Sequence, residues 1–140
     1  MLYRWRLHPE QTSRWSSCYS PEQFRRARAH FLARTLRSSG RPLWILGAGP
    51  TGKRLAKALA AEGLEPTAFA DVDPRKIGGH VALGARCAPR WPVRSMDDLF
   101  AARPRPIAIA AVGQLGARER IRHWLCSRGW SETEDFWVAA

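Results

Sequence analysis

The chain has 140 residues, which fits one domain with a sizeable core and excludes a cofactor domain joined to a separate substrate domain. It has 45% hydrophobic and 25% charged residues, as globular proteins do, and its apolar runs are too short to cross a bilayer, so we expect no membrane span. The net charge of +11 comes mainly from arginine and is concentrated in residues 1–41. Because no nucleic-acid-binding motif accompanies it, we expect no nucleic-acid partner, and we interpret the basic part as a solvated face or a surface for an acidic partner.

The N-terminus and the cysteines indicate where the protein works. "MLYRWRLHPEQ" is positively charged, but no apolar segment of the kind found in secretory signals follows it, so we expect a cytoplasmic protein. Cys18, Cys87 and Cys126 form no CxxC or Cys/His spacing. We therefore expect reduced cysteines and no metal site.

The first 40 residues predict an irregular arm followed by one helix. Residues 1–19 lack a regular pattern, whereas "SPEQFRRARAHFLARTLRSSG" has a helix N-cap at Ser20 and proline at the first helical position. The helix should cover residues 21–38 and end near Gly40. We expect it to pack on the domain through one apolar stripe and to leave its arginines in water; the stripe contains Phe24, Phe31 and Leu32.

Apolar strands alternate with amphipathic helices over residues 41–140. The predicted strands are "PLWILG", "PTAFAD", "PIAIAAVG" and "DFWVAA", and the predicted helices are about Thr51 to Glu62, Ser95 to Ala102 and "GARERIRHWLCSRG". Residues 72–93 contain so many glycines and prolines that we expect a long loop with short extended pieces. The alternation predicts an α/β fold: a three-layer, Rossmann-like parallel sheet over residues 41–140, preceded by a helical arm over residues 1–40.

A GxGxxG pattern follows the first predicted strand and opens the next helix. Gly47 permits a tight turn, Gly49 lets the backbone approach a phosphate, and Gly52 allows the helix to pack close to the strand. The helix N-terminus, near Thr51, presents free N–H groups and a partial positive charge. This context predicts a phosphate-binding loop.

Acidic residues and a further glycine complete the predicted site. Asp71 lies 19 residues after Gly52, at the end of the second strand, where a carboxylate can accept hydrogen bonds from ribose hydroxyls; Asp73 is its substitute. The loop after the third strong strand, with Gly113, should form another wall. The predicted ligand-binding residues are Gly47, Gly49, Thr51, Gly52, Asp71, Asp73 and Gly113. The alternative that the glycines only permit close packing, with no ligand, stays open at this point.

Three segments carry a resemblance to a known group of proteins. "ILGAGPTGKRLAKAL", "FADVDPRKIGG" and "PVRSMDDL", spread over residues 43–100, resemble the N-terminal Rossmann-like domains of polysaccharide-biosynthesis proteins. That group includes sugar O-acyltransferases and nucleotide-sugar dehydratases. The resemblance implies a nucleotide or nucleotide-sugar ligand.

A second resemblance covers the two ends of the chain. The C-terminal "IAIAAVGQLGARERIRHWLCSRGWSETEDFWVAA" is similar to a Rossmann-like domain fused behind bacterial family 2 glycosyltransferases, and the N-terminal arm is similar to the last segment of their catalytic domain. The sugar-nucleotide-binding half of that family is absent from these 140 residues. We therefore expect part of a longer fusion, with a glycosyltransferase catalytic domain as partner. His8, Arg14 and Tyr19 are then surface or docking residues.

Catalysis has little support in the sequence. The two tyrosines, Tyr3 and Tyr19, lie in the arm, so no YxxxK pair of a short-chain dehydrogenase exists, and His80 in the glycine-rich loop is the one candidate acid or base near the site. We assign no catalytic residue. The sequence favours a noncatalytic module that binds a nucleotide or nucleotide sugar and serves a glycosyltransferase. The alternative is a fragment of an NAD(P)-dependent oxidoreductase, and the residues do not separate NAD from a nucleotide sugar as ligand.

Overall fold

The computed structural model describes residues 20–82, 84 and 90–139. The predictions for the irregular arm, and for His8, Arg14, Tyr19, Cys18 and Cys87, lie outside the described residues.

A six-stranded sheet forms the centre of the domain. Its strands follow the order β3-β4-β2-β1-β5-β6. All neighbours pair in parallel except β3 and β4, which are antiparallel. The strand bounds are β1 Leu43–Leu46, β2 Ala68–Ala70, β3 His80–Ala82, β4 Arg90–Arg94, β5 Ile107–Ala110 and β6 Phe136–Val138.

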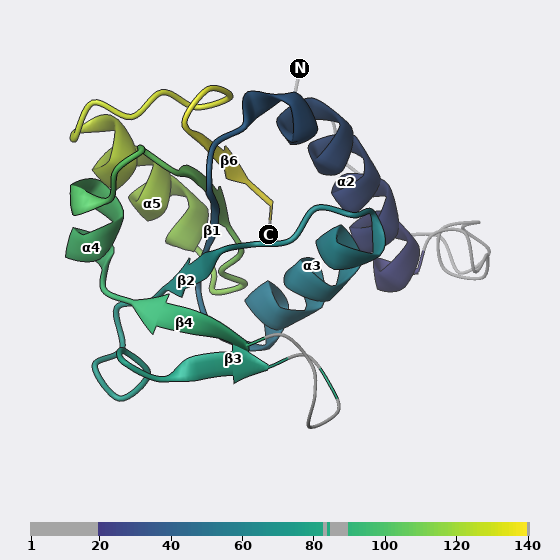
Figure 1. Cartoon of the computed structure of the whole chain (residues 1–140), viewed down its shortest axis with the longest axis horizontal. Helices are drawn as coiled ribbons and strands as arrows, with labels where there is room; N and C mark the ends of the chain where they lie inside the picture. The colour runs from purple at the N-terminus through teal and green to yellow at the C-terminus, as the bar shows by residue number, and fades with distance from the viewer. Residues whose placement is uncertain (1–19, 83, 85–89, 140) are drawn as a thin grey trace, which may run out of the picture.

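Helices cover both faces of this sheet (Figure 1). On one face lie α2 (Pro21–Leu36), which continues into a 3-10 turn (Arg37–Ser39), and α3 (Pro50–Ala61). On the other lie α4 (Met96–Ala101) and α5 (Ala117–Cys126). The chain passes from β1 through α3 to β2, and later returns through α4 to β5 on the other side of β1. The predicted α/β, Rossmann-like fold is confirmed, and its first strand lies inside the sheet.

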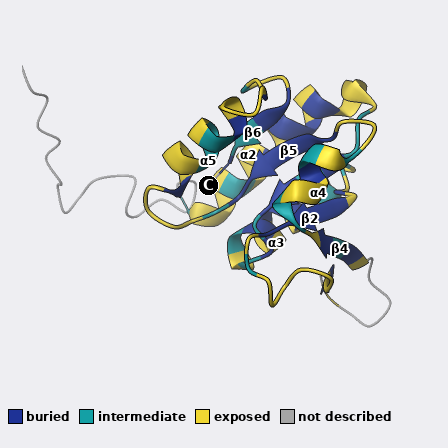
Figure 2. Cartoon of the chain, turned by 90° about the vertical axis from the view of Figure 1, so that its left-hand side faces the viewer, coloured by how far each residue is buried: buried dark blue, intermediate teal, exposed yellow. Residues whose placement is uncertain are grey.

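The strands divide the interior into two apolar cores. Side chains that alternate along each strand point to opposite faces, so one core joins the sheet to α2 and α3 through Ile45, Phe69 and Ile109. The other joins it to α4 and α5 through residues such as Leu46 and Ala110. Figure 2 shows the strands as buried and the outer faces of the helices as exposed. Burial on both faces explains why these strands are continuous apolar runs.

The helix ends agree with the sequence signals. Ser20 accepts a hydrogen bond from the Gln23 N–H at 3.2 Å, and Ser95 and Asp98 form a reciprocal capping box at the start of α4. Gly129, which follows α5, has a φ of +74°, a conformation that favours glycine. Local sequence therefore sets where these helices begin and end.

The short extended pieces that we expect within the long loop over residues 72–93 are two strands of the sheet. The segments 80–82 and 90–94 are β3 and β4, and β4 pairs with β2 in parallel through Phe69 and Val93. Trp91 and Val93 are buried against the sheet's core. Pro92 inside the strand and the surrounding glycines obscured an alternating pattern that only pairing with β2 stabilises.

The predicted contact face of α2 was wrong in two of its three residues. Leu32 is buried, but Phe24 and Phe31 are 55% and 65% exposed. The buried stripe consists instead of Ala29, Leu32, Ala33 and Leu36, which has helical spacing but small side chains that give a weaker hydrophobic signal. Arg28 is exposed, as expected for the arginines of this helix, and it also donates a hydrogen bond to the Ala139 carbonyl.

Candidate functional site

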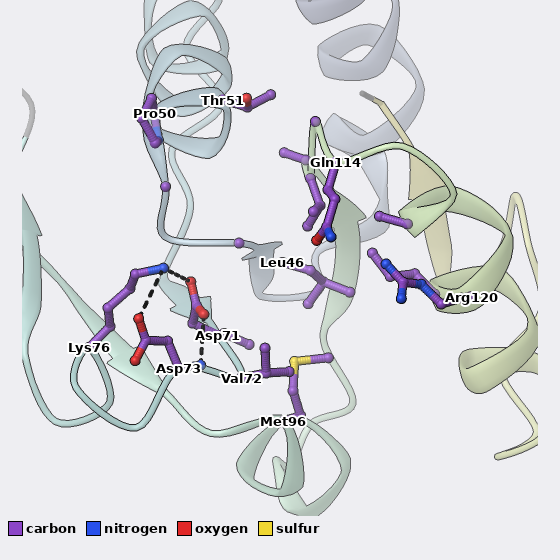
Figure 3. A pocket seen from close by; sticks show the side chains of 18 residues that line it. Leu46, Pro50, Thr51, Asp71, Val72, Asp73, Lys76, Met96, Gln114 and Arg120 are labelled. Atoms are coloured by element: carbon purple, nitrogen blue, oxygen red, sulfur yellow. Dashed lines mark hydrogen bonds and ion pairs between the residues drawn. The ribbon is translucent and has the colours of Figure 1, made fainter.

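A cavity of about 600 Å³ lies at the carboxyl ends of β1, β2 and β5. Its walls are the loops after these three strands and the first turns of α3, α4 and α5 (Figure 3). The chain leaves β1 towards β2 on one side and reaches β5 on the other, so the cavity occupies the point where the strand order reverses. Ligands of open α/β sheets bind at this position.

Two glycines of the loop are required by the protein's own packing. Gly47 has a φ of +102°, and an added Cβ would lie 3.0 Å from Val112 Cγ2 and 3.3 Å from the Ala111 carbonyl oxygen. A Cβ at Gly52 would lie 1.9 Å from the Gly47 carbonyl oxygen. Gly52 therefore lets α3 pack against the turn, as predicted, and it does not line the cavity.

Gly49 differs from both. Its φ of −88° is open to any residue, and an added Cβ would have no described atom within 4 Å. Gly49 lines the cavity and is the N-cap of α3, where no side chain accepts a hydrogen bond from the first turn. Pro50 follows it in the first turn, so the N–H groups directed outwards come from the neighbouring residues. The cavity therefore receives an uncapped helix N-terminus.

Asp71 is 7% exposed and links three parts of the site. Its Oδ2 accepts hydrogen bonds from the Ala48 N–H at 2.8 Å and Lys76 Nζ at 3.0 Å, and its Oδ1 accepts one from the Asp73 N–H at 2.9 Å. Burial by itself would raise the pKa of Asp71, but the two backbone hydrogen bonds and Lys76 outweigh it, and the pKa lies below its ordinary value. Asp71 is therefore ionised at neutral pH and holds the glycine loop.

The neighbouring charges extend this cluster. Lys76 Nζ lies 3.8 Å from Asp73 Oδ2, and Arg75 donates hydrogen bonds to both carboxylate oxygens of Asp73 at 3.1 and 3.2 Å. The side-chain hydrogen bond from Arg75 is the main reason that the pKa of Asp73 lies below its ordinary value. One edge of the cavity thus carries two carboxylates that their own neighbours already hold in place (Figure 3).

The opposite wall comes from β5 and α5. An added Cβ at Gly113 would lie 3.2 Å from Thr51 Oγ1, so this glycine allows the loop after β5 to approach the start of α3. Gln114 and Arg120 face the cavity from this side, across from Lys76 and Asp71 (Figure 3). Arg120 belongs to none of the ion pairs among the described residues.

The structure brings most of the predicted residues to one cavity. Those that line it are Gly47, Gly49, Thr51, Asp71, Asp73 and Gly113, whereas Gly52 packs behind the loop. His80 lies on β3 and is not among the lining residues. Sequence reasoning missed Val72, Lys76, Met96 and Arg120. Val72 and Lys76 follow β2, as Asp71 does, so their place after a strand could have predicted that they line the cavity. The sequence around Arg120 contains no such signal.

Comparisons with known proteins give little further information. No protein-family model and no curated protein matches this chain. Among solved structures, an uncharacterized protein from Burkholderia thailandensis aligns with 25% identity over 65% of this chain and 27% of its own, with a TM-score of 0.33. That score is too low to support an argument about fold or function. Within the described part of the chain, no helix has the length and apolar character needed to cross a membrane.

Proposed function

We propose that the cavity binds the phosphates of a nucleotide or nucleotide sugar and that the protein is a noncatalytic binding module. The ligand's phosphates lie over the loop from Gly47 to Gly52, at the N-terminus of α3. Uncapped N–H groups and the helix dipole attract a phosphate there. The volume of about 600 Å³ is within the range of small-molecule sites.

Gly49 is the observation that carries this proposal. Gly47 and Gly52 are explained by a positive φ and by close packing, so they support a structural turn as readily as a ligand site. Gly49 has neither requirement, and its Cα faces open space inside the cavity. A glycine there allows a ligand to approach the backbone more closely than any side chain would permit.

The acidic edge of the cavity suits a ribose. A carboxylate has about four acceptor sites, and Asp71 uses three of them for Ala48, Asp73 and Lys76. The remaining site is on Oδ1, which accepts a single hydrogen bond within the protein. Asp71 accepts a ribose hydroxyl at this oxygen, and Asp73 stands beside it at the same edge.

The charge pattern favours binding over catalysis. Asp71, Asp73, Lys76 and Arg120 are the titratable side chains of the lining, and the first three are already joined in one ion-paired cluster. A group that is held ionised in this way is a poor proton-transfer partner at neutral pH. The resemblance of residues 43–100 to polysaccharide-biosynthesis domains supports a nucleotide sugar as ligand and a glycosyltransferase as the enzyme served.

Calorimetry with NAD, NADP, UDP-glucose and acetyl-CoA tests the proposal. UDP-glucose should bind the unmodified protein, and Gly49→Val should remove the binding without lowering the melting temperature, because its side chain enters the phosphate space. Gly49→Ala should weaken binding by about tenfold, or about 1.4 kcal/mol.

Ala61→Val is the matched control, because it adds a branched side chain at the exposed far end of the same helix and should leave binding unchanged. If none of the four compounds binds at millimolar concentration, the glycine loop is only architectural. Binding of NAD with a preference over UDP-glucose would favour the oxidoreductase alternative.

A further inference from the structure

A second hollow, of about 620 Å³, lies at the opposite end of the sheet. Its lining consists of Phe100, Arg103, Arg105, Arg128 and Trp130. Arg103 and Arg105 stand just before β5, and Arg128 and Trp130 lie between α5 and β6, so the hollow is at the amino ends of these parallel strands. It shares no lining residue with the cavity beside the glycine loop.

Three aromatic rings form a scaffold beneath the arginines. The Phe100 ring lies 4.9 Å from Trp124 and 5.6 Å, edge to face, from Trp130, measured between ring centroids. The Arg128 guanidinium lies over Trp124 at 4.3 Å and over Phe100 at 5.3 Å, and that of Arg105 lies over Trp130 at 4.8 Å. These cation–π contacts restrict the guanidinium groups before any ligand arrives.

The positive charge of this cluster is only partly neutralised within the described chain. Asp135 pairs with Arg41 at 2.8 Å and with Arg105 at 3.4 Å. Arg103 donates from Nη1 to the carbonyls of Phe100 and Ala102, which leaves its other nitrogens free for a ligand. Neither Arg103 nor Arg128 belongs to an ion pair among the described residues.

We propose that this hollow is a second binding site, for the phosphate groups of a soluble, multiply charged ligand such as a diphosphate. The planar guanidinium of Arg128 and the free nitrogens of Arg103 match phosphate oxygens, and Arg105 adds positive charge beside them. Because a single carboxylate faces several guanidinium groups, the cluster keeps an excess of positive charge, which suits an anion with more than one negative charge. The site is distinct from the glycine loop and does not depend on it.

The aromatic residues define which phosphate compounds fit. Trp130 is only 3% exposed, and arginines cover the faces of Trp124 and Trp130, so these rings are occupied within the protein. These rings therefore offer a nucleic-acid base little free surface on which to stack, and they are not free to insert into a bilayer. The site therefore recognises charge and phosphate geometry, which favours a soluble diphosphate.

Calorimetric titration with inorganic pyrophosphate at matched ionic strength tests this site. The titration uses the full chain with Gly49→Val as background, because pyrophosphate would also bind an open glycine loop. One saturable site is expected, and Arg128→Gln should weaken it at least about tenfold. Arg128→Lys keeps the charge but loses the planar fork, so binding should remain weakened by several-fold.

Arg118→Gln is the control for net charge, because this exposed arginine of α5 lies outside both hollows and should change binding less than about twofold. Arg103→Gln provides a second test if Arg128→Gln does not fold, because Arg103 makes no cation–π contact in the scaffold. Equal effects of the pocket and control variants, or no saturable binding in the Gly49→Val background, would overturn the proposal.

Discussion

The two buried carboxylates of the described chain lie at opposite ends of the sheet, and their surroundings differ. Asp71 directly follows β2 at the carboxyl ends, and Asp135 directly precedes β6 at the amino ends. Each accepts hydrogen bonds from a backbone N–H and from cationic side chains: Lys76 for Asp71, and Arg41 and Arg105 for Asp135. The chemistry that stabilises the two carboxylates is therefore the same.

The difference lies in what each carboxylate organises. Asp135 connects the starts of neighbouring strands, because Arg41, which precedes β1, reaches both Asp135 and the Pro106 carbonyl before β5. Asp71 instead holds the N–H of Ala48 in a glycine loop, beside an open cavity. A buried carboxylate can thus connect strands at one end of a sheet and position a binding loop at the other.

The largest expected effect concerns the glycine loop that Asp71 holds. Gly52→Ala places a Cβ 1.9 Å from the Gly47 carbonyl oxygen, so α3 must move away from the sheet, and we expect a loss of about 3 kcal/mol or more in the free energy of unfolding. Gly49→Ala, with open space around its Cβ, should change it by less than about 0.5 kcal/mol. Urea denaturation measures both. Equal stability of the two variants would contradict the packing role of Gly52.

Removing the carboxylate at the amino ends should be the next largest change. Asp135→Ala removes the acceptor of the Ser131 N–H and the carboxylate that pairs with two arginines, and we expect a loss of about 2 to 3 kcal/mol in the free energy of unfolding. Ligand binding at the glycine loop should be unchanged, since the loop lies at the other end. Glu65→Ala, which removes an exposed acid, is the control for net charge. A variant as stable as this control would show that the strands do not depend on Asp135.

Asp71→Ala should destabilise less but should also weaken binding. The Ala48 and Asp73 N–H groups lose their acceptor, while the half-exposed Lys76 contributes little, so we expect about 1 to 2 kcal/mol. Because the glycine loop loses the carboxylate that holds it, the affinity for UDP-glucose should fall together with stability. In Asp135→Ala, by contrast, only stability should fall. Calorimetry beside urea denaturation separates the two readouts. Unchanged ligand affinity would contradict the role of Asp71 in the site.

The smallest expected effect is a dependence of stability on acid pH. The pKa values of Asp71 and Asp135 are lowered in the folded protein despite burial, which alone would raise them, because backbone and cationic donors stabilise the charged forms. This stabilisation is complete above the unfolded value of about 3.9 and is lost as the pH falls through the lowered folded values. The urea concentration at the midpoint of unfolding should therefore decrease as the pH is lowered below about 4.

Asp71→Asn and Asp135→Asn distinguish this linkage from the general repulsion of a protein with net charge +11. Each substitution should reduce the steepness of the acid decline, because one carboxylate no longer gains a proton. A pH dependence identical to that of the unmodified chain would show that neither carboxylate contributes to it.

The sequence predicted most of the fold and the place of the candidate site within it. Continuous apolar runs such as 43–46 and 107–110 are typical of buried parallel strands, and caps such as Ser95 with Asp98 set the helix starts. Six of the seven predicted binding residues line the cavity, because residues that follow parallel strands must meet at one edge. Arg120 could not be predicted, since a charged residue on an amphipathic helix has no signal that assigns it to a cavity.

Local spacing by itself determined where most strands and helices form and that a glycine turn opens α3, because dihedral freedom, capping and apolar periodicity depend on neighbours along the chain. Tertiary structure decided that residues 90–94 become a strand, since their pairing with β2 and the burial of Trp91 depend on partners distant in sequence. It also decided that Asp71 holds Ala48 and that two arginines stack on a cluster of three aromatic rings. A hydrogen bond or a ring contact requires two groups to meet, and only the folded chain brings these groups together.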